Sequence, residues 1–224
     1  MRPPIEFLSS PDIGIQLMYS FVIILCSLMI YFSTKEMYEL SSYKGIKFFR
    51  KAFLFFAIAY FFRYFIAVLL MFFGIKGILE ISPLFVGIIS LFIFLYSSAM
   101  AVFYLSYSVM WKKWNHKMKI YILHIFAVAI ALIGTVFASD MIYFLINIIL
   151  LIFVAINLII MNRDSGKKRK NLVVIYALLF IFWVLNIIDI LIPQFFQFYQ
   201  LLIYLASISL FMTILYKVLK RIGE

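Results

Sequence analysis

Two charged residues interrupt apolar stretches that are otherwise long enough to cross a membrane. Arg63 stands near the middle of the run 52–74, and Asp189 stands near the end of the run 172–192. A charged side chain at the centre of a bilayer costs at least about 2.5–3.5 kcal/mol when it faces lipid, so each must face protein or trapped water. Intramembrane charges commonly line binding pockets, ion paths or proton relays. Arg63 and Asp189 are therefore the leading candidates for a functional site.

The depth of both residues follows from the helical rise. Counted from predicted helix starts at 52 and 172, Arg63 lies about 16 Å deep, near the midplane, and Asp189 about 25 Å deep. Side chains lean toward the amino-terminal end of their helix, which brings Asp189 toward the level of Arg63. We therefore expect an ion pair or a water bridge between them. Four further residues are expected to extend this polar layer from the midplane outward: Asn147, Asn186, Ser97 and Ser207.

The polar layer has two interpretations. In the first it is a hydrated pocket, in which Arg63 holds an anionic group or Asp189 takes and gives a proton. In the second it is a buried structural pair that fixes the register of the helices. A further polar pair, His124 with Asn157, is expected nearer the opposite membrane face, and we interpret it as an interhelical hydrogen bond. With one cysteine and two histidines in the chain, we predict no metal site and no cofactor.

Seven apolar runs must position these residues. Each is close to the 20 residues that a membrane-spanning helix needs. The sequence therefore predicts an all-α, polytopic membrane protein with one transmembrane domain, residues 1–224. The first helix is expected to run past its span to about Ser41. The predicted spans are 14–32, 52–74, 84–110, 120–138, 141–161, 172–192 and 195–216.

Small residues indicate which helix faces pack together, because they let helices approach closely in a bilayer. In the second span, Ala52 and Ala59 share a face with Arg63, so we expect this face to meet the bundle. The bulky face that carries Phe53 is expected to meet lipid. In the fourth span, the stripe 127–138 has Ala or Gly at every third or fourth position, which indicates a second close contact.

The basic residues indicate the orientation of the chain. The formal net charge is +11, and most Lys and Arg lie in the loops after the first, third and fifth spans and in the tail. Because cytoplasmic loops are enriched in Lys and Arg, the amino terminus is predicted outside and the carboxyl terminus in the cytoplasm, with the plasma membrane as location. This placement beside spans favours contact with anionic lipid and argues against nucleic acid. One basic run could contact lipid or a protein partner, or serve as a topology signal alone: Lys167, Lys168, Arg169 and Lys170.

The sequence says less about activity. It contains no HExxH, GxSxG or Walker motif, and acids and bases are scarce, so we predict a protein that is not an enzyme. Our first hypothesis is a sensor or receptor-like module that binds a small or lipidic ligand in the bundle and signals to a cytoplasmic or membrane partner. One alternative is a small transporter or channel with Arg63 and Asp189 lining its path. Another is a membrane assembly or scaffold subunit.

Overall fold

Helices make up the described part of the chain. The computed structural model describes residues 13–65, 83–111, 118–163, 170–191 and 197–223. Six of its helices are long and apolar enough to span a membrane, and the shorter α2 makes a seventh helix. This confirms the all-α prediction and the membrane character of the chain. The elements are α1 (Ile13–Ser41), α2 (Lys44–Tyr60), the π-helix η2 (Phe61–Phe65), α4 (Pro83–Met110), α5 (Met118–Phe137), α6 (Asp140–Arg163), α7 (Lys170–Leu191) and α8 (Gln197–Gly223).

The helix boundaries agree with the predicted spans except in two places. As predicted, α1 continues to Ser41. The last helix runs on to Gly223, beyond the predicted end of its span at residue 216. The second helix begins at Lys44, eight residues before the predicted start, because the basic stretch is already helical. Residues 66–74 of the predicted second span lie outside the described residues.

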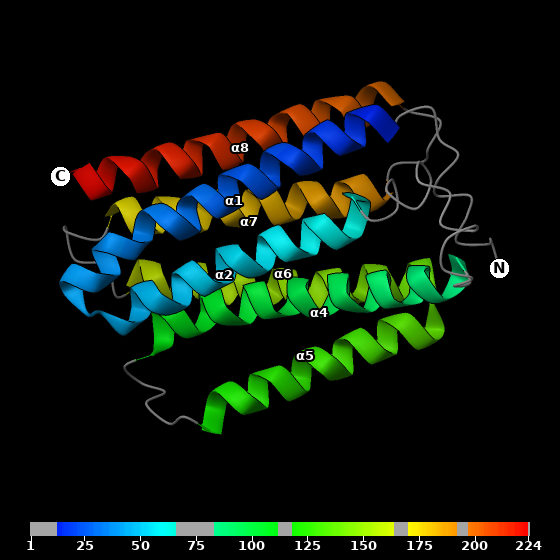
Figure 1. Cartoon of the computed structure of the whole chain (residues 1–224), viewed down its shortest axis with the longest axis horizontal. Helices are drawn as coiled ribbons and strands as arrows, with labels where there is room; N and C mark the ends of the chain where they lie inside the picture. The colour runs from blue at the N-terminus through cyan, green and yellow to red at the C-terminus, as the bar shows by residue number, and fades with distance from the viewer. Residues whose placement is uncertain (1–12, 66–82, 112–117, 164–169, 192–196, 224) are drawn as a thin grey trace.

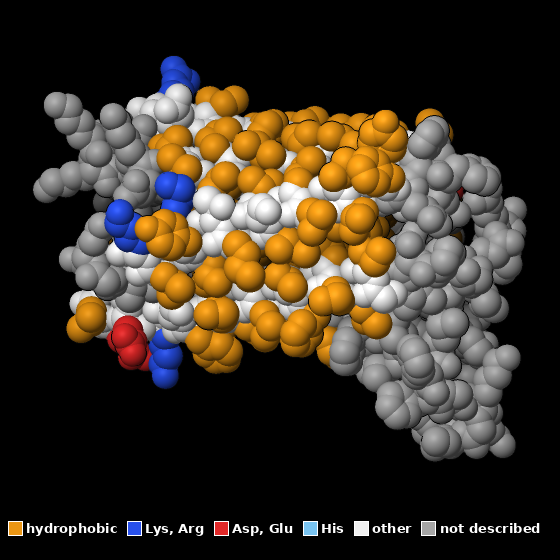
Figure 2. Space-filling model, turned by 90° about the horizontal axis from the view of Figure 1, so that it is seen from above, with side chains coloured by type: hydrophobic (Ala, Val, Ile, Leu, Met, Phe, Trp, Pro, Cys, Tyr) orange, Lys and Arg blue, Asp and Glu red, His pale blue; other side chains and the backbone are white. Residues whose placement is uncertain are grey.

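The helices lie side by side, roughly along one common axis (Figure 1). We call the two ends of this bundle the Ile13 end, where α1, α4, α6 and α8 begin, and the Lys44 end, where α2, α5 and α7 begin. In the face that Figure 2 presents, apolar side chains cover the flank of the bundle and Lys and Arg gather at the Lys44 end. This is the surface of a protein whose middle meets lipid and whose end meets water.

The core is centred on α4, which packs against α2, α5 and α6. Residues 99–105 of α4 are all almost fully buried, so this helix is enclosed on every side. In α2, Ala52 and Ala59 are buried as expected. Phe53 is fully buried as well, so the prediction that its face meets lipid was wrong. The reason is that α1 and α4 both pack on α2, and the Phe53 ring reaches Phe211 of α8.

The edge of the bundle is formed by α5, which packs mainly on α4 and only slightly on α6 (Figure 1). Its predicted small stripe makes the contact with α4: Ala127 and Ala131 are fully buried. A Cβ placed on Gly134 would lie 2.4 Å from Leu95 Cδ1, so a larger residue there would force the Leu95 side chain to move. The opposite side of α5 is apolar and exposed.

The turn between α5 and α6 contains a strained residue, Ala138, whose φ is +40°. Its N–H donates to Gly134 O at 3.1 Å, the bond of an αL helix cap. Glycine adopts this conformation without the Cβ clash, so we expect Ala138→Gly to raise the free energy of unfolding by about 0.5–1 kcal/mol. Thermal denaturation in detergent measures this change in the free energy of unfolding. The matched control is Ala129→Gly in the exposed interior of α5, which should lower stability by about 1 kcal/mol. Equal losses for both variants would contradict the strain.

Candidate functional site

The structure brings Arg63 and Asp189 together. Arg63 Nη2 lies 3.6 Å from Asp189 Oδ2, and the two side chains are only 15% and 10% exposed. Arg63 Nη1 also donates to Asn186 Oδ1, at 3.5 Å. Both contacts are long for charged hydrogen bonds, which are typically about 2.7–2.9 Å. The guanidinium is thus paired with two side chains of α7.

Tyrosines from three helices surround this pair. The Tyr60 hydroxyl donates to Asn186 Oδ1 at 2.9 Å, and the Tyr19 hydroxyl lies 3.1 Å from the Tyr60 hydroxyl. The Tyr19 ring stacks on Tyr204 with centroids 4.7 Å apart, and Tyr204 hydrogen-bonds the Asp189 carboxylate. These contacts join α1, α2, α7 and α8 around one polar layer. A change at the ion pair can therefore reach four helices.

One oxygen of the pair is left without a partner. Asp189 Oδ1 is buried and accepts no hydrogen bond from the described residues. Leaving a buried polar group unsatisfied typically costs about 1–3 kcal/mol, and more when it is charged. The site therefore gains stability from any donor that reaches this oxygen.

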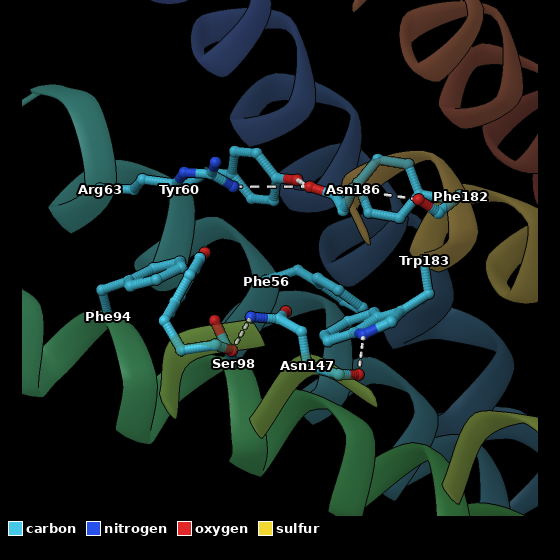
Figure 3. A pocket seen from close by; sticks show the side chains of 10 residues that line it. Phe56, Tyr60, Arg63, Phe94, Ser98, Asn147, Phe182, Trp183 and Asn186 are labelled. Carbon is cyan, nitrogen blue, oxygen red and sulfur yellow. Dashed lines mark hydrogen bonds between the residues drawn. The ribbon is translucent and has the colours of Figure 1, made fainter. Parts of the chain in front are cut away.

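A small cavity adjoins the Arg63 and Asn186 side chains (Figure 3). The centre of a water molecule can lie anywhere within about 20 Å³ of this cavity. That is room for one or two waters. The Phe94 ring lies beside Arg63, with its centroid 5.5 Å from the guanidinium carbon. Trp183 Nε1 donates to Asn147 O at 3.3 Å on the opposite wall. The lining residues are Phe56, Tyr60, Arg63, Phe94, Ser98, Tyr143, Asn147, Phe182, Trp183 and Asn186.

The helix boundaries give the position of the pair along the bundle. By the helical rise, Arg63 lies about 28 Å along from the start of α2, and Asp189 about 28 Å along from the start of α7. Asp189 is two residues from the end of α7, at the Ile13 end. The depth of Arg63 in the bilayer stays a prediction, because α2 begins at Lys44, eight residues before the predicted start of the apolar span. The site lies toward the Ile13 end of the bundle.

The other residues predicted for this layer divide into two groups. Asn147 and Asn186 line the cavity, on α6 and α7. Ser97 and Ser207 are each 1% exposed but are not among its lining residues. Ser98, the neighbour of Ser97, lines it instead. Ser207 Oγ has no hydrogen-bond partner among the described residues, so it is a buried polar atom apart from this cavity.

The predicted pair of His124 and Asn157 is not formed. His124 Nδ1 lies 2.7 Å from the Tyr96 hydroxyl and its Nε2 lies 3.3 Å from the Tyr104 hydroxyl. Asn157 Nδ2 donates to Ser106 Oγ at 2.6 Å. The reason is that α5 and α6 share a short turn but each packs on α4, so both side chains find partners there.

The predicted basic contact cannot be located in space. Lys167, Lys168 and Arg169 lie outside the described residues, and Lys170 is the first residue of α7. The role of this basic run in binding lipid or a protein partner stays a prediction.

Sequence reasoning missed the aromatic half of the site. Tyr60 stands one helical turn before Arg63, and that spacing was a usable signal for a shared face. Tyr204 and Phe94 belong to distant helices and carry no local signal. The π-helix that presents Arg63 was missed as well, although such segments occur frequently at functional sites. We found no sequence pattern that would have revealed it.

Comparison with known proteins gives one informative match. The chain is 30% identical to an "Uncharacterized protein" of Archaeoglobus fulgidus (strain ATCC 49558), over 98% of this chain and 96% of that protein. No family model matches the chain. No solved structure matches it.

Proposed function

Since the chain belongs to the same family as this Archaeoglobus fulgidus protein, whose description names no activity, a function must be inferred from the chain's own site. We propose that the chain is a non-enzymatic, receptor-like membrane module. Its Arg63 pocket binds the polar group of a small or lipidic ligand. The resulting shift of the helices is passed to a cytoplasmic or membrane protein partner.

The observation that carries this proposal is the buried Asp189 Oδ1, which has no hydrogen-bond partner among the described residues although its carboxylate pairs with Arg63. A purely structural pair gains most from short, complete hydrogen bonding, because a half-satisfied polar network destabilises a core. The water-sized cavity beside Arg63 and Asn186 provides room for an additional polar group.

The polar atoms define which chemical group fits. Asp189 Oδ1 needs a donor, and the Arg63 side chain can donate to an acceptor. Asp189 itself is not among the residues that line the cavity, so the donor of a ligand must extend beyond the cavity to reach it. An amide, a hydroxyl or a protonated carboxyl group carries both within a few ångströms. An ionised carboxylate carries no hydrogen-bond donor, and its negative charge would be repelled by the Asp189 carboxylate. The pocket therefore favours a neutral polar group over an anion.

The cavity has room for the polar group of a ligand but not for its alkyl chain, which must lie outside the cavity. A transporter with Arg63 and Asp189 on its path needs a passage wider than one or two water molecules during its cycle. The tyrosine contacts that tie four helices to the pair suit a module that converts occupancy into helix movement.

The membrane topology is part of the proposal. We propose that α2, with the π-helix after it, is the first half of a seventh span. Described Lys and Arg other than Arg63 lie at the Lys44 end, as in Lys44, Lys47 and Lys220. By the distribution of positive charge, that end faces the cytoplasm and the amino terminus lies outside, in the plasma membrane.

Trp183 makes the pocket observable. The chain has three tryptophans, so Trp111→Phe with Trp114→Phe leaves Trp183 as the only indole. We expect hexanamide, which both donates and accepts, to shift the emission of this variant in detergent micelles. Hexanoate of the same chain length should need an at least about tenfold higher concentration to give the same emission shift, since it cannot donate a hydrogen bond to Asp189.

Two substitutions test where the ligand binds. Asp189→Asn removes the charge of the acceptor. It should raise the hexanamide concentration needed for the emission shift about tenfold or more. Asp140→Asn, at the exposed start of α6, removes the same charge elsewhere and should leave the response unchanged. Equal responses to hexanamide and hexanoate, or no response at all, would contradict the proposal. Hexanamide-coupled flux across proteoliposomes would favour the transporter, and a stable membrane complex without any ligand response would favour the scaffold.

A further inference from the structure

A second cluster of polar and basic side chains lies at the other end of the bundle. It joins α2, α4 and α5, and we call it the Lys51 cluster: Lys47, Lys51, Tyr96, Tyr104 and His124. It is far from the Arg63 pocket, because Lys51 and Arg63 are separated by about 18 Å along their helix. The receptor proposal does not use it.

The Tyr104 ring is in contact with side chains from two other helices in this cluster. Its hydroxyl lies 3.3 Å from His124 Nε2, while His124 Nδ1 is 2.7 Å from the Tyr96 hydroxyl. The rings of Phe48 and Phe55 stack on Tyr104 with centroids 6.1 and 5.4 Å away. The ammonium of Lys51 lies over this ring, 5.5 Å from its centroid. These contacts fix the position of a positive charge on the side of the bundle.

The charge of the cluster is not compensated. Lys47 and Lys51 are one turn apart on α2, and neither has an ion pair among the described residues. The described acidic side chains at this end are Glu36 and Glu39 on α1, both exposed, and Glu39 pairs with Lys35 at 3.8 Å. Lys51 also acts electrostatically on His124. The cluster therefore attracts an anion.

The depth of the cluster identifies the kind of anion. Lys51 is seven residues from the start of α2, Tyr104 six from the end of α4 and His124 six from the start of α5, so all lie about 9–11 Å from the Lys44 end. α2 and α5 both pack on α4 and make little contact with each other (Figure 1). Lys51 and His124 stay half-buried, at the side of the bundle rather than in its core. A phosphate at this depth belongs to a lipid headgroup, and its acyl chains would meet the exposed apolar side chains of α5 such as Tyr121 and Ile125.

We propose that the Lys51 cluster is a binding site for the phosphate of an anionic phospholipid, held between α2 and α5. Lys47 and Lys51 contact the headgroup, and the Tyr104 ring positions the Lys51 ammonium. The lipid would thereby tie the edge helix α5 to α2.

Native mass spectrometry of the purified chain in nonionic detergent tests the site. We expect phosphatidylglycerol to bind more tightly than phosphatidylcholine of the same acyl chains, which has no net charge. Lys47→Gln with Lys51→Gln should weaken phosphatidylglycerol binding about 10- to 30-fold, from the typical attraction of one basic residue to an anionic surface. Tyr104→Phe keeps the ring and should keep most of the binding.

The matched control removes two charges at the same end but on α8. Lys217→Gln with Lys220→Gln should change phosphatidylglycerol binding less than about twofold, because α8 packs mainly on α1 and α7, away from the α4 and α5 side chains of the cluster. An equal loss in both double variants would show general attraction to charge and overturn the site. Lack of preference for phosphatidylglycerol would overturn it as well. Glycerol 3-phosphate that competes at millimolar concentration would show a site for soluble phosphate and overturn the lipid assignment. Size-exclusion chromatography establishes that each variant is folded.

Discussion

Replacing Asp189 by alanine is expected to lower the free energy of unfolding by about 3–5 kcal/mol. The substitution leaves the Arg63 guanidinium 15% exposed and without its counter-charge. Asn186 still accepts one hydrogen bond from it, but at 3.5 Å this contact is long. The cavity beside Arg63 has room for only one or two waters, too few to replace the counter-charge that is lost. Reversible unfolding in mixed micelles, followed by circular dichroism, measures the change.

Two variants separate this effect from loss of side-chain volume. Asp140→Ala removes an exposed carboxylate from the first turn of α6 and should cost no more than about 1 kcal/mol. Arg63→Met with Asp189→Leu removes both charges and should return stability to within about 2 kcal/mol of the wild type, because apolar side chains often replace a buried pair without loss. A small cost for Asp189→Ala would mean that Arg63 reaches water.

The double variant also decides between the two interpretations of the pair. If the pair only fixes helix register, the variant with two apolar residues keeps every response of the folded protein. If the pair is a binding site, the variant stays folded and no longer responds to hexanamide at Trp183. Stability and response are thus measured on the same molecule, and the two interpretations predict different results.

The sequence predicted the elements well because bilayer thickness dictates their length. Long apolar runs bounded by charges allow few structures other than helices, so most of the predicted spans match helices of the structure. The pairing of Arg63 with Asp189 was also predictable, since two isolated opposite charges in apolar runs have few other partners. The count of seven spans and the orientation stay predictions.

The sequence could not predict the neighbours of each helix. His124 was assigned to Asn157 because their helices are consecutive, yet α4 lies against both and supplies Tyr96, Tyr104 and Ser106 instead. Phe53 was assigned to lipid because bulky faces usually meet lipid, but α2 is enclosed. Periodicity shows that a helix has faces. It does not show which helix covers each face.

Removing the Phe211 ring is expected to cost about 3–5 kcal/mol. Phe211 is fully buried and joins three helices through its ring contacts. Its centroid lies 4.6 Å from that of Phe182 and 6.0 Å from that of Phe56, and Phe53 is 6.4 Å away. Phe211→Ala leaves a cavity that these rings can fill only by leaving their rotamers, so the transfer and cavity costs add. Unfolding in mixed micelles measures the loss.

The matched control for this variant is Phe126→Ala on α5, where the ring is 58% exposed. It should change stability by no more than about 0.5 kcal/mol, because little packing is lost. Phe211→Leu refills part of the volume and should recover most of the loss. Phe56 and Phe182 also line the Arg63 cavity, so Phe211→Ala should alter the Trp183 emission before any ligand is added. Equal costs for Phe211→Ala and Phe126→Ala would show that α8 does not pack on α2 and α7 at this point, and the wall of the pocket would then need another support.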